Sequence, residues 1–109
     1  MTRSEYLLDV RSRIANNIRF HRQQRGMNQA EFADFVGLAE NTVFLLENVS
    51  KDYTIPMATL VGVAHALGLS VMAMLVERER PPNLHGKKGR EHLNQMREQY
   101  EYERERHQV

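Results

Sequence analysis

The chain has 109 residues, of which 41% are hydrophobic and 27% charged, with six glycines and three prolines. This length favours one small domain, and the composition is typical of globular proteins rather than of disordered or low-complexity chains. The formal net charge of +1 does not by itself point to a polyanionic partner. The absence of cysteine excludes disulfides, thiolate metal sites and thiol nucleophiles.

The first predicted helix covers residues 4–25. Its apolar residues recur at steps of three and four, which is the spacing of one helix face. These residues are Tyr6, Leu7, Val10, Ile14 and Ile18. Gly26 follows directly, and glycine readily takes the left-handed conformation that ends a helix. We therefore expect the first helix to close at Gly26.

Two short helices are predicted next. Asn28 is suited to be the N-cap of the second helix, and Glu31, three positions later, completes a partial capping box. Gly37 is expected to end this helix. A third helix over residues 40–48 is expected to bury Val43 and Leu46.

A polar loop, residues 49–55, leads to Pro56, a natural first-turn proline. The fourth helix is predicted over residues 57–67, and Gly68 closes it. Ser70 then caps a fifth helix over residues 71–79. The fourth helix is expected to turn four apolar residues inward, namely Leu60, Val63, Ala64 and Leu67. Five short helices joined by tight turns predict a compact all-α domain.

Residues 28–47 have the outline of a helix-turn-helix: a short helix, a glycine turn and a second short helix. Over residues 14–75 the chain resembles the Cro/C1-type (lambda and 434 repressor-like) helix-turn-helix family. The matching positions are Ile18, Arg22, Gly26, Met27, Asn28, Gln29, Phe32, Ala33, Val36, Gly37, Thr42, Val43, Leu46, Glu47, Pro56, Leu60, Ala64 and residues 66–70. The resemblance implies a five-helix DNA-binding domain over residues 14–79 that binds operator DNA, usually as a symmetric dimer. A helical N-terminal extension, residues 1–13, would precede it, and a polar, charged C-terminal tail, residues 80–109, would follow.

The resemblance also implies roles for individual residues. Gln29 matches the position where a side chain and the positive end of the second helix meet a phosphate. Arg22 and Glu47 match a partly buried ion pair that closes the first helix onto the third. Asn41 is suited to reading adenine, and Glu40 to accepting from cytosine N4. The candidate DNA-binding residues are Asn28, Gln29, Ala39, Glu40, Asn41, Thr42, Phe44, Leu45, Asn48, Lys51 and Tyr53.

Three apolar residues depart from the family pattern. Phe44 and Leu45 stand where the family often has polar or basic residues, and Phe35 stands where a polar residue is common. Few side chains are therefore available to read base edges by direct hydrogen bonds, although an apolar side chain can still contact the methyl group of thymine. We favour a sequence-specific transcriptional regulator, and a repressor because no part of the chain is large enough for a ligand-sensing module. The alternative is a protein-interaction module, an antitoxin or adaptor, that uses Phe35, Phe44 and Leu45.

Residues 71–76 form a run of six apolar residues, and one helix face cannot bury all of them against one small core. We expect Met72, Ala73 and Val76 to lie at or beside a two-fold homodimer interface. Packing by residues 6–10 is the alternative. The run is far shorter than the ~20 residues that cross a bilayer, and residues 1–10 contain no signal-type apolar block. We therefore expect a cytoplasmic protein without a membrane partner.

The tail begins near Pro81 and Pro82, since the residue before a proline is disfavoured in a helix. A helix over residues 90–106 is predicted, while disorder and docking onto a partner subunit both stay open. The histidines show no ligand spacing, the carboxylates are dispersed, and no phosphate-binding loop occurs. We therefore expect neither an enzyme nor a bound metal or cofactor.

Overall fold

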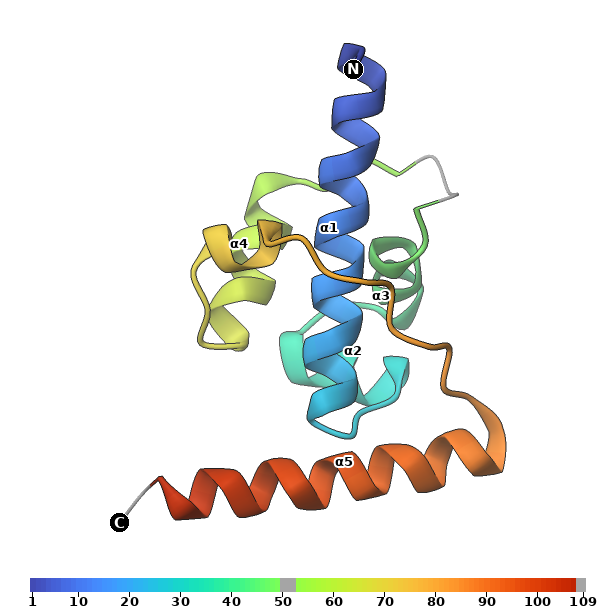
Figure 1. Ribbon diagram of the computed structural model, residues 1–109, viewed down its shortest axis with the longest axis vertical. Helices are drawn as coiled ribbons and strands as arrows, with labels where there is room; N and C mark the ends of the chain where they lie inside the picture. Colours follow the sequence, from blue (N-terminus) through green and yellow to red (C-terminus); the bar gives the residue numbers. More distant parts are fainter. Residues whose placement is uncertain (50–52, 108–109) are drawn as a thin grey trace.

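Five α-helices and one short 3-10 helix make up the part of the chain that the computed structural model describes, residues 1–49 and 53–107 (Figure 1). They are α1 (Arg3–Gln24), α2 (Gln29–Val36), α3 (Glu40–Glu47), α4 (Met57–Ala66), the 3-10 helix η1 (Val71–Leu75) and α5 (Gly86–Arg106). No strand occurs in these two stretches, which confirms the all-α fold. No helix within them is both long and apolar enough to span a membrane.

The predicted helix ends agree with the structure where local side chains set them. At α2, the Asn28 side chain accepts from the Glu31 backbone N–H at 2.8 Å, and Glu31 accepts from the Asn28 N–H at 2.9 Å. This is the complete capping box. Gly26, Gly37 and Gly68 all have positive φ angles at the ends of helices. Pro56 is the N-cap of α4 rather than its first helical residue.

The core lies where α1 crosses the other helices of the N-terminal two thirds of the chain. The predicted inward residues are buried, including Ile14 and Ile18 of α1 and Val43 and Leu46 of α3. The complete cluster is Ile14, Ile18, Phe32, Ala33, Val43, Leu46, Leu60, Val63, Ala64, Leu67 and Met74. The start of α1 extends beyond this core, so that Tyr6 and Leu7 are exposed despite their helical spacing (Figure 1).

The prediction of a fifth helix over residues 71–79 is wrong in its length. Ser70 caps the element as expected, but it is a 3-10 helix that ends at Leu75, and Val76 is extended. The reason is a contact with α1. The buried side-chain amide of Asn17 donates to the carbonyls of Met74 (3.0 Å) and Val76 (2.7 Å), two carbonyls that a continuing helix would use for its own ladder.

Residues 76–85, which we call the 76–85 segment, run without regular structure along α1 toward α5 (Figure 1). Side chains of α1 donate to successive backbone carbonyls of this segment. Asn16 donates to Arg78 (2.9 Å), Arg19 to Pro81 (3.4 Å) and Gln23 to Pro82 (2.5 Å). In return, Arg78 donates to the Asn17 side chain at 2.9 Å, and its guanidinium lies 3.6 Å from the centre of the Phe20 ring. The segment is therefore part of the packed structure.

The C-terminal tail contains the expected helix, which begins four residues earlier than predicted, at Gly86. In the structure α5 packs on the α1–α2 turn of its own chain (Figure 1). Leu93 is buried there, and Arg97 donates to the Gly26 carbonyl at 2.7 Å. A Cβ on Gly26 would overlap Arg97 and the Leu93 carbonyl. Glycine is thus required at position 26 both by the positive φ angle of the turn and by the close contact with α5.

Glu31 connects the capping box of α2 to α5. Its carboxylate pairs with Arg90 and with Arg97, the latter at 3.2 Å. Burial raises the pKa of Glu31, but the hydrogen bond from the Asn28 N–H and the charges of Arg90 and Arg97 outweigh it, so that the pKa lies below its usual value. The ionised form is therefore favoured in the folded state, and this contribution to stability is lost as the pH falls below the ordinary range of a glutamate.

The end of the apolar run stays uncovered within the described chain. Met72 is 74% exposed and Val76 53% exposed, while Ala73 is half-buried. Residues 6–8 of α1 are themselves exposed, so the alternative in which the N-terminal extension covers this run is not what the structure shows.

We expect Glu31→Gln to loosen α5 and to leave α2 intact, because glutamine keeps the capping hydrogen bond but has no charge for Arg90 and Arg97. Partly exposed ion pairs contribute about 0.2–1 kcal/mol each. Amide hydrogen exchange in residues 86–106 should therefore become several-fold faster, with no change in residues 29–36. Asp34→Asn, an exposed carboxylate on the same helix, is the matched control. Unchanged exchange in α5 of the Glu31 variant would contradict this role.

Candidate nucleic-acid interface

Helices α2 and α3 form a tight pair whose turn is fixed by the backbone and by apolar contacts. Gly37 has φ +76°, and the Leu38 N–H donates to the Ala33 carbonyl at 2.9 Å. Phe32 and Ala33 of α2 are buried with Val43 of α3 in the core. The angle between the two helices is therefore set by the packed interior, and the outer face of α3 has a fixed position.

A buried charge cluster holds α3 against α1. Glu47 accepts from Arg22 Nε at 2.6 Å and from Arg22 Nη2 at 2.9 Å, and its side chain is 1% exposed. This is the ion pair expected from the sequence. The structure adds Arg19, whose Nε donates to the same carboxylate at 3.2 Å. Because all three groups have lost contact with water, each depends on the others to offset its desolvation.

Arg11 completes the attachment of α3. Its guanidinium donates to the carbonyls of Leu45 (2.7 Å) and Leu46 (2.9 Å), in the last turn of α3. Cations stabilise the C-terminal end of a helix, where carbonyls lack helical partners. Burial lowers the pKa of Arg11, with a smaller opposing effect from Tyr53. A stripe of arginines along α1, at positions 11, 19 and 22, therefore holds the last turn of α3.

The outer face of α3 carries the residues predicted to face DNA. Ala39 is the N-cap, and Ala39, Glu40, Asn41 and Phe44 are exposed, whereas Thr42 and Leu45 are half-buried. The face is thus mixed, with polar side chains in the first turn and apolar ones in the second. Asn48 follows as the C-cap of α3 and is half-buried.

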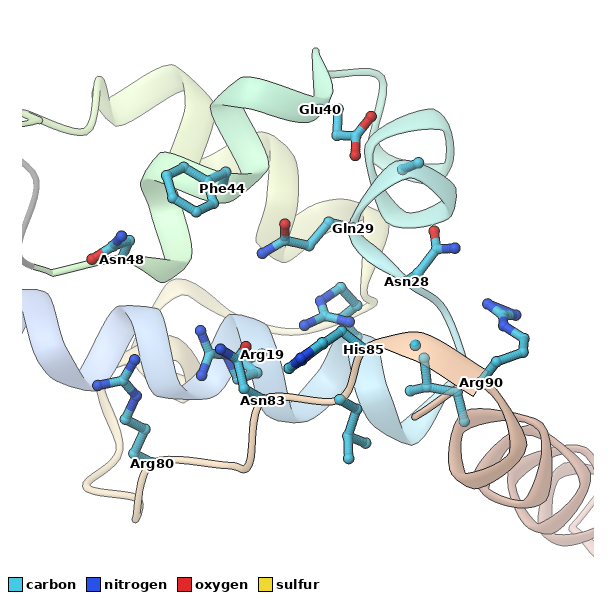
Figure 2. Close-up of a pocket in the computed structure, with 15 residues that line it drawn as sticks. Arg19, Asn28, Gln29, Glu40, Phe44, Asn48, Arg80, Asn83, His85 and Arg90 are labelled. Carbon is cyan, nitrogen blue, oxygen red and sulfur yellow. The ribbon is translucent and has the colours of Figure 1, made fainter. Parts of the chain in front are cut away.

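The start of α2 lies beside this face. Asn28 is exposed and caps the helix, as described above. Gln29 is half-buried, and its amide donates to Glu47 at 3.3 Å, so the side chain extends toward the charge cluster rather than straight into solvent (Figure 2). The buried carboxylate therefore orients Gln29 as well as holding α3.

A cleft of about 520 Å³ opens between these helices and the C-terminal part of the chain, and we call it the Gln29 cleft (Figure 2). One side consists of the start of α2 and the face of α3. The other side consists of the 76–85 segment and the first turns of α5. Its lining residues are Arg19, Arg22, Asn28, Gln29, Ala30, Glu40, Phe44, Asn48, Arg80, Asn83, Leu84, His85, Gly86, Arg90 and Leu93.

The structure does not bring all the predicted residues to this cleft. Tyr53 packs against the core and lines a separate groove with Leu7 and Leu8 at the start of α1. Phe35 lines a third cleft, between α2, α4 and α5, away from Phe44. Lys51 lies outside the described residues.

Sequence reasoning missed two groups of residues at this site. Arg19 and Arg11 had a usable signal, because they lie three and eleven positions before Arg22, on the same face of a helix. Arg80, Asn83 and His85 had none, since they belong to an irregular segment whose path is set by contacts with distant residues.

No protein-family model, curated protein or solved structure matches the chain. Within residues 1–49 and 53–107, no group of three or more histidines and carboxylates is arranged to hold a metal ion.

We expect Glu47→Ala to destabilise the protein more than Arg22→Ala. The first change leaves two buried guanidinium groups without a carboxylate, whereas the second leaves Glu47 its bond from Arg19. Removing one partner of a buried pair costs about 3–5 kcal/mol, and Arg22→Ala should fall at the low end of this range. Urea unfolding midpoints at unchanged m-value measure the difference.

The matched control is Arg13→Ala, because the Arg13–Asp9 pair is partly exposed and lies within one helix. Such pairs contribute about 0.3–0.5 kcal/mol. If all three variants unfolded at the same urea concentration, the cluster would have no special role in stability.

Proposed function

We propose that the protein is a sequence-specific DNA-binding transcriptional regulator, a dimeric repressor of the Cro/C1-type family that acts in the cytoplasm. The observation that carries this proposal is the fixed outer face of α3, with the start of α2 beside it. A short helix that presents exposed side chains from a rigid support is the arrangement with which a helix-turn-helix enters the major groove. The resemblance of residues 14–75 to that family supports the same conclusion.

The exposed residues of α3 suit direct readout of a few base pairs. Asn41 has the amide that pairs with N6 and N7 of adenine, and Glu40 can accept from N4 of cytosine. Phe44 and Leu45 supply apolar surface for the methyl group of thymine. Both polar side chains lie in the first turn of α3, which is the end of a recognition helix that contacts base edges.

The start of α2 suits a phosphate. Its backbone N–H groups and the positive end of the helix dipole favour an anion, Asn28 adds a side-chain amide, and Gln29 has one amide hydrogen besides the one that it donates to Glu47. Phosphate contacts of this kind fix the register of the protein on DNA but do not read sequence.

The competing function is a protein-interaction module that uses Phe35, Phe44 and Leu45 as one apolar face. Phe35 and Phe44 line different clefts, which favours DNA binding over this alternative. The two functions also differ in their dependence on salt, because neutralising phosphates releases counterions and makes DNA affinity fall steeply with ionic strength.

We expect Asn41→Ala and Gln29→Ala to weaken operator binding without loss of fold. A good base contact contributes about 1–3 kcal/mol of discrimination, so Asn41→Ala should also relax sequence preference. Gln29→Ala should lower affinity for all sequences alike. Fluorescence anisotropy with duplexes from the promoter region of the protein's own gene measures both effects, with the exposed Asn94→Ala on α5 as control. Unchanged affinity in both variants would refute DNA reading by α3.

The proposed dimer uses the uncovered end of the apolar run. Met72 and Val76 are exposed large apolar residues close together in the chain, and burying them against a second copy would remove them from water. If the dimer has the geometry of the family that the sequence resembles, two copies of α3 meet half-sites about 34–36 Å apart, one helical turn of DNA.

Met72→Glu should give a folded monomer with little operator affinity, because it places like charges beside the two-fold axis. Tyr102→Glu is the control, since Tyr102 is also exposed, at 56%, but lies near the far end of α5. Analytical ultracentrifugation at tens of micromolar, a concentration chosen to favour a weak dimer, measures the mass. A monomeric wild type, or a Met72→Glu variant that stays dimeric, would contradict this interface.

A further inference from the structure

The side of the Gln29 cleft that faces α2 and α3 is made by the 76–85 segment, and this side is held rigidly. Hydrogen bonds from α1 hold the carbonyls of Met74, Val76, Arg78, Pro81 and Pro82. The two prolines also restrict their own φ angles. Arg80 lies between two of these held positions, so its backbone has a fixed place at the end of the cleft near Asn48 of α3 (Figure 2).

Arg80 differs from the other arginines of the cleft in its partners. Arg19 and Arg22 pair with Glu47, and Arg90 pairs with Glu31. Among the described residues Arg80 forms no ion pair or hydrogen bond, and it is exposed at the edge of the cleft. Its charge is therefore available to a ligand, whereas the other three guanidinium groups are already engaged with a carboxylate.

Further donors lie on the same side of the cleft. Asn83 and His85 are exposed cleft residues whose side chains form no hydrogen bond within the described structure. Across the cleft are Asn28, Gln29 and the first N–H groups of α2. Glu40 contributes the carboxylate that lines the cleft, at the α3 side (Figure 2). A ligand that carries negative charge and many acceptor oxygens fits this set of donors.

We propose that the Gln29 cleft takes a stretch of the DNA sugar–phosphate backbone, with Arg80 contacting a phosphate at the α3 end of the cleft and Asn83 and His85 donating along the same wall toward α2. This inference rests on the proposed function and adds a second wall to its interface. Arginine binds phosphate oxygens through two parallel N–H bonds, which gives a directed contact. The C-terminal third of the chain thus belongs to the DNA interface instead of lying apart from it.

The proposed contact is with the sugar–phosphate backbone of DNA, so its loss should change the salt dependence of binding and not the sequence preference. Each phosphate neutralised adds about 0.9 to the slope of log affinity against log salt concentration. Arg80→Gln should therefore reduce this slope by about 1 and lower affinity for operator and unrelated duplexes by the same factor. Asn41→Ala, in contrast, should change the preference between the two duplexes and leave the slope in place.

The experiment measures full-length wild type, Arg80→Gln, Arg80→Lys and Arg3→Gln by fluorescence anisotropy across salt concentrations. Arg3 is exposed at the start of α1, a part of the helix that does not line the cleft, and is the matched control for loss of one charge. Arg80→Lys keeps the charge and should restore most of the slope. Circular dichroism confirms that each variant is folded. A further variant, His85→Gln, tests a second residue on the same side of the cleft and should weaken binding to both duplexes equally.

The outcomes separate the two proposals. If wild type binds no duplex, the proposed function fails, and this inference fails with it. If wild type binds and Arg80→Gln keeps the wild-type slope, or loses no more than Arg3→Gln, only the inference is overturned. Tighter binding by Arg80→Gln would also overturn it, because the 76–85 segment would then compete with DNA for the cleft.

Discussion

The buried carboxylate of Glu47 is the group on which the arrangement of the helices depends. Two arginines of α1 and the amide of Gln29 converge on it, and the remaining donors of those arginines reach the carbonyls of Met27 and Pro81. One carboxylate thus connects α1, α3, the start of α2, the α1–α2 turn and the 76–85 segment. Since a buried charge is tolerated only when it is paired and hydrogen-bonded, these parts are constrained to keep their relative positions.

Local signals in the sequence were sufficient for most of the fold. The capping box at Asn28, the left-handed glycines and the apolar spacing of the first four helices all act within a few residues, so the pattern predicted them to within about one residue. The element after Ser70 was predicted too long because the side chain that ends it, Asn17, is more than fifty positions away. No local propensity contains that information.

The candidate site likewise has one part that the sequence predicts and another that depends on contacts between distant residues. Arg22, Glu47 and the face of α3 were predictable, because helical spacing and the family resemblance both specify them. The other side of the Gln29 cleft was not, since it exists only after the tail has packed on α1. A tail rich in glutamate and arginine has the composition of a solvated segment, and its position depends on a few contacts such as those of Gly26, Leu93 and Arg97.

The distance along the chain between the partners of these contacts also sets an order of folding. Arg97 and Gly26 are 71 positions apart, and the bonds from α1 to the 76–85 segment join residues 59 to 62 positions apart. Closing loops of that length costs entropy before any contact compensates for it, whereas α2 and α3 meet across a single tight turn. The last helix therefore adds to a surface that the earlier helices have already built. A nascent or truncated chain that lacks residues 76–109 would have the face of α3 in place but only one side of the cleft.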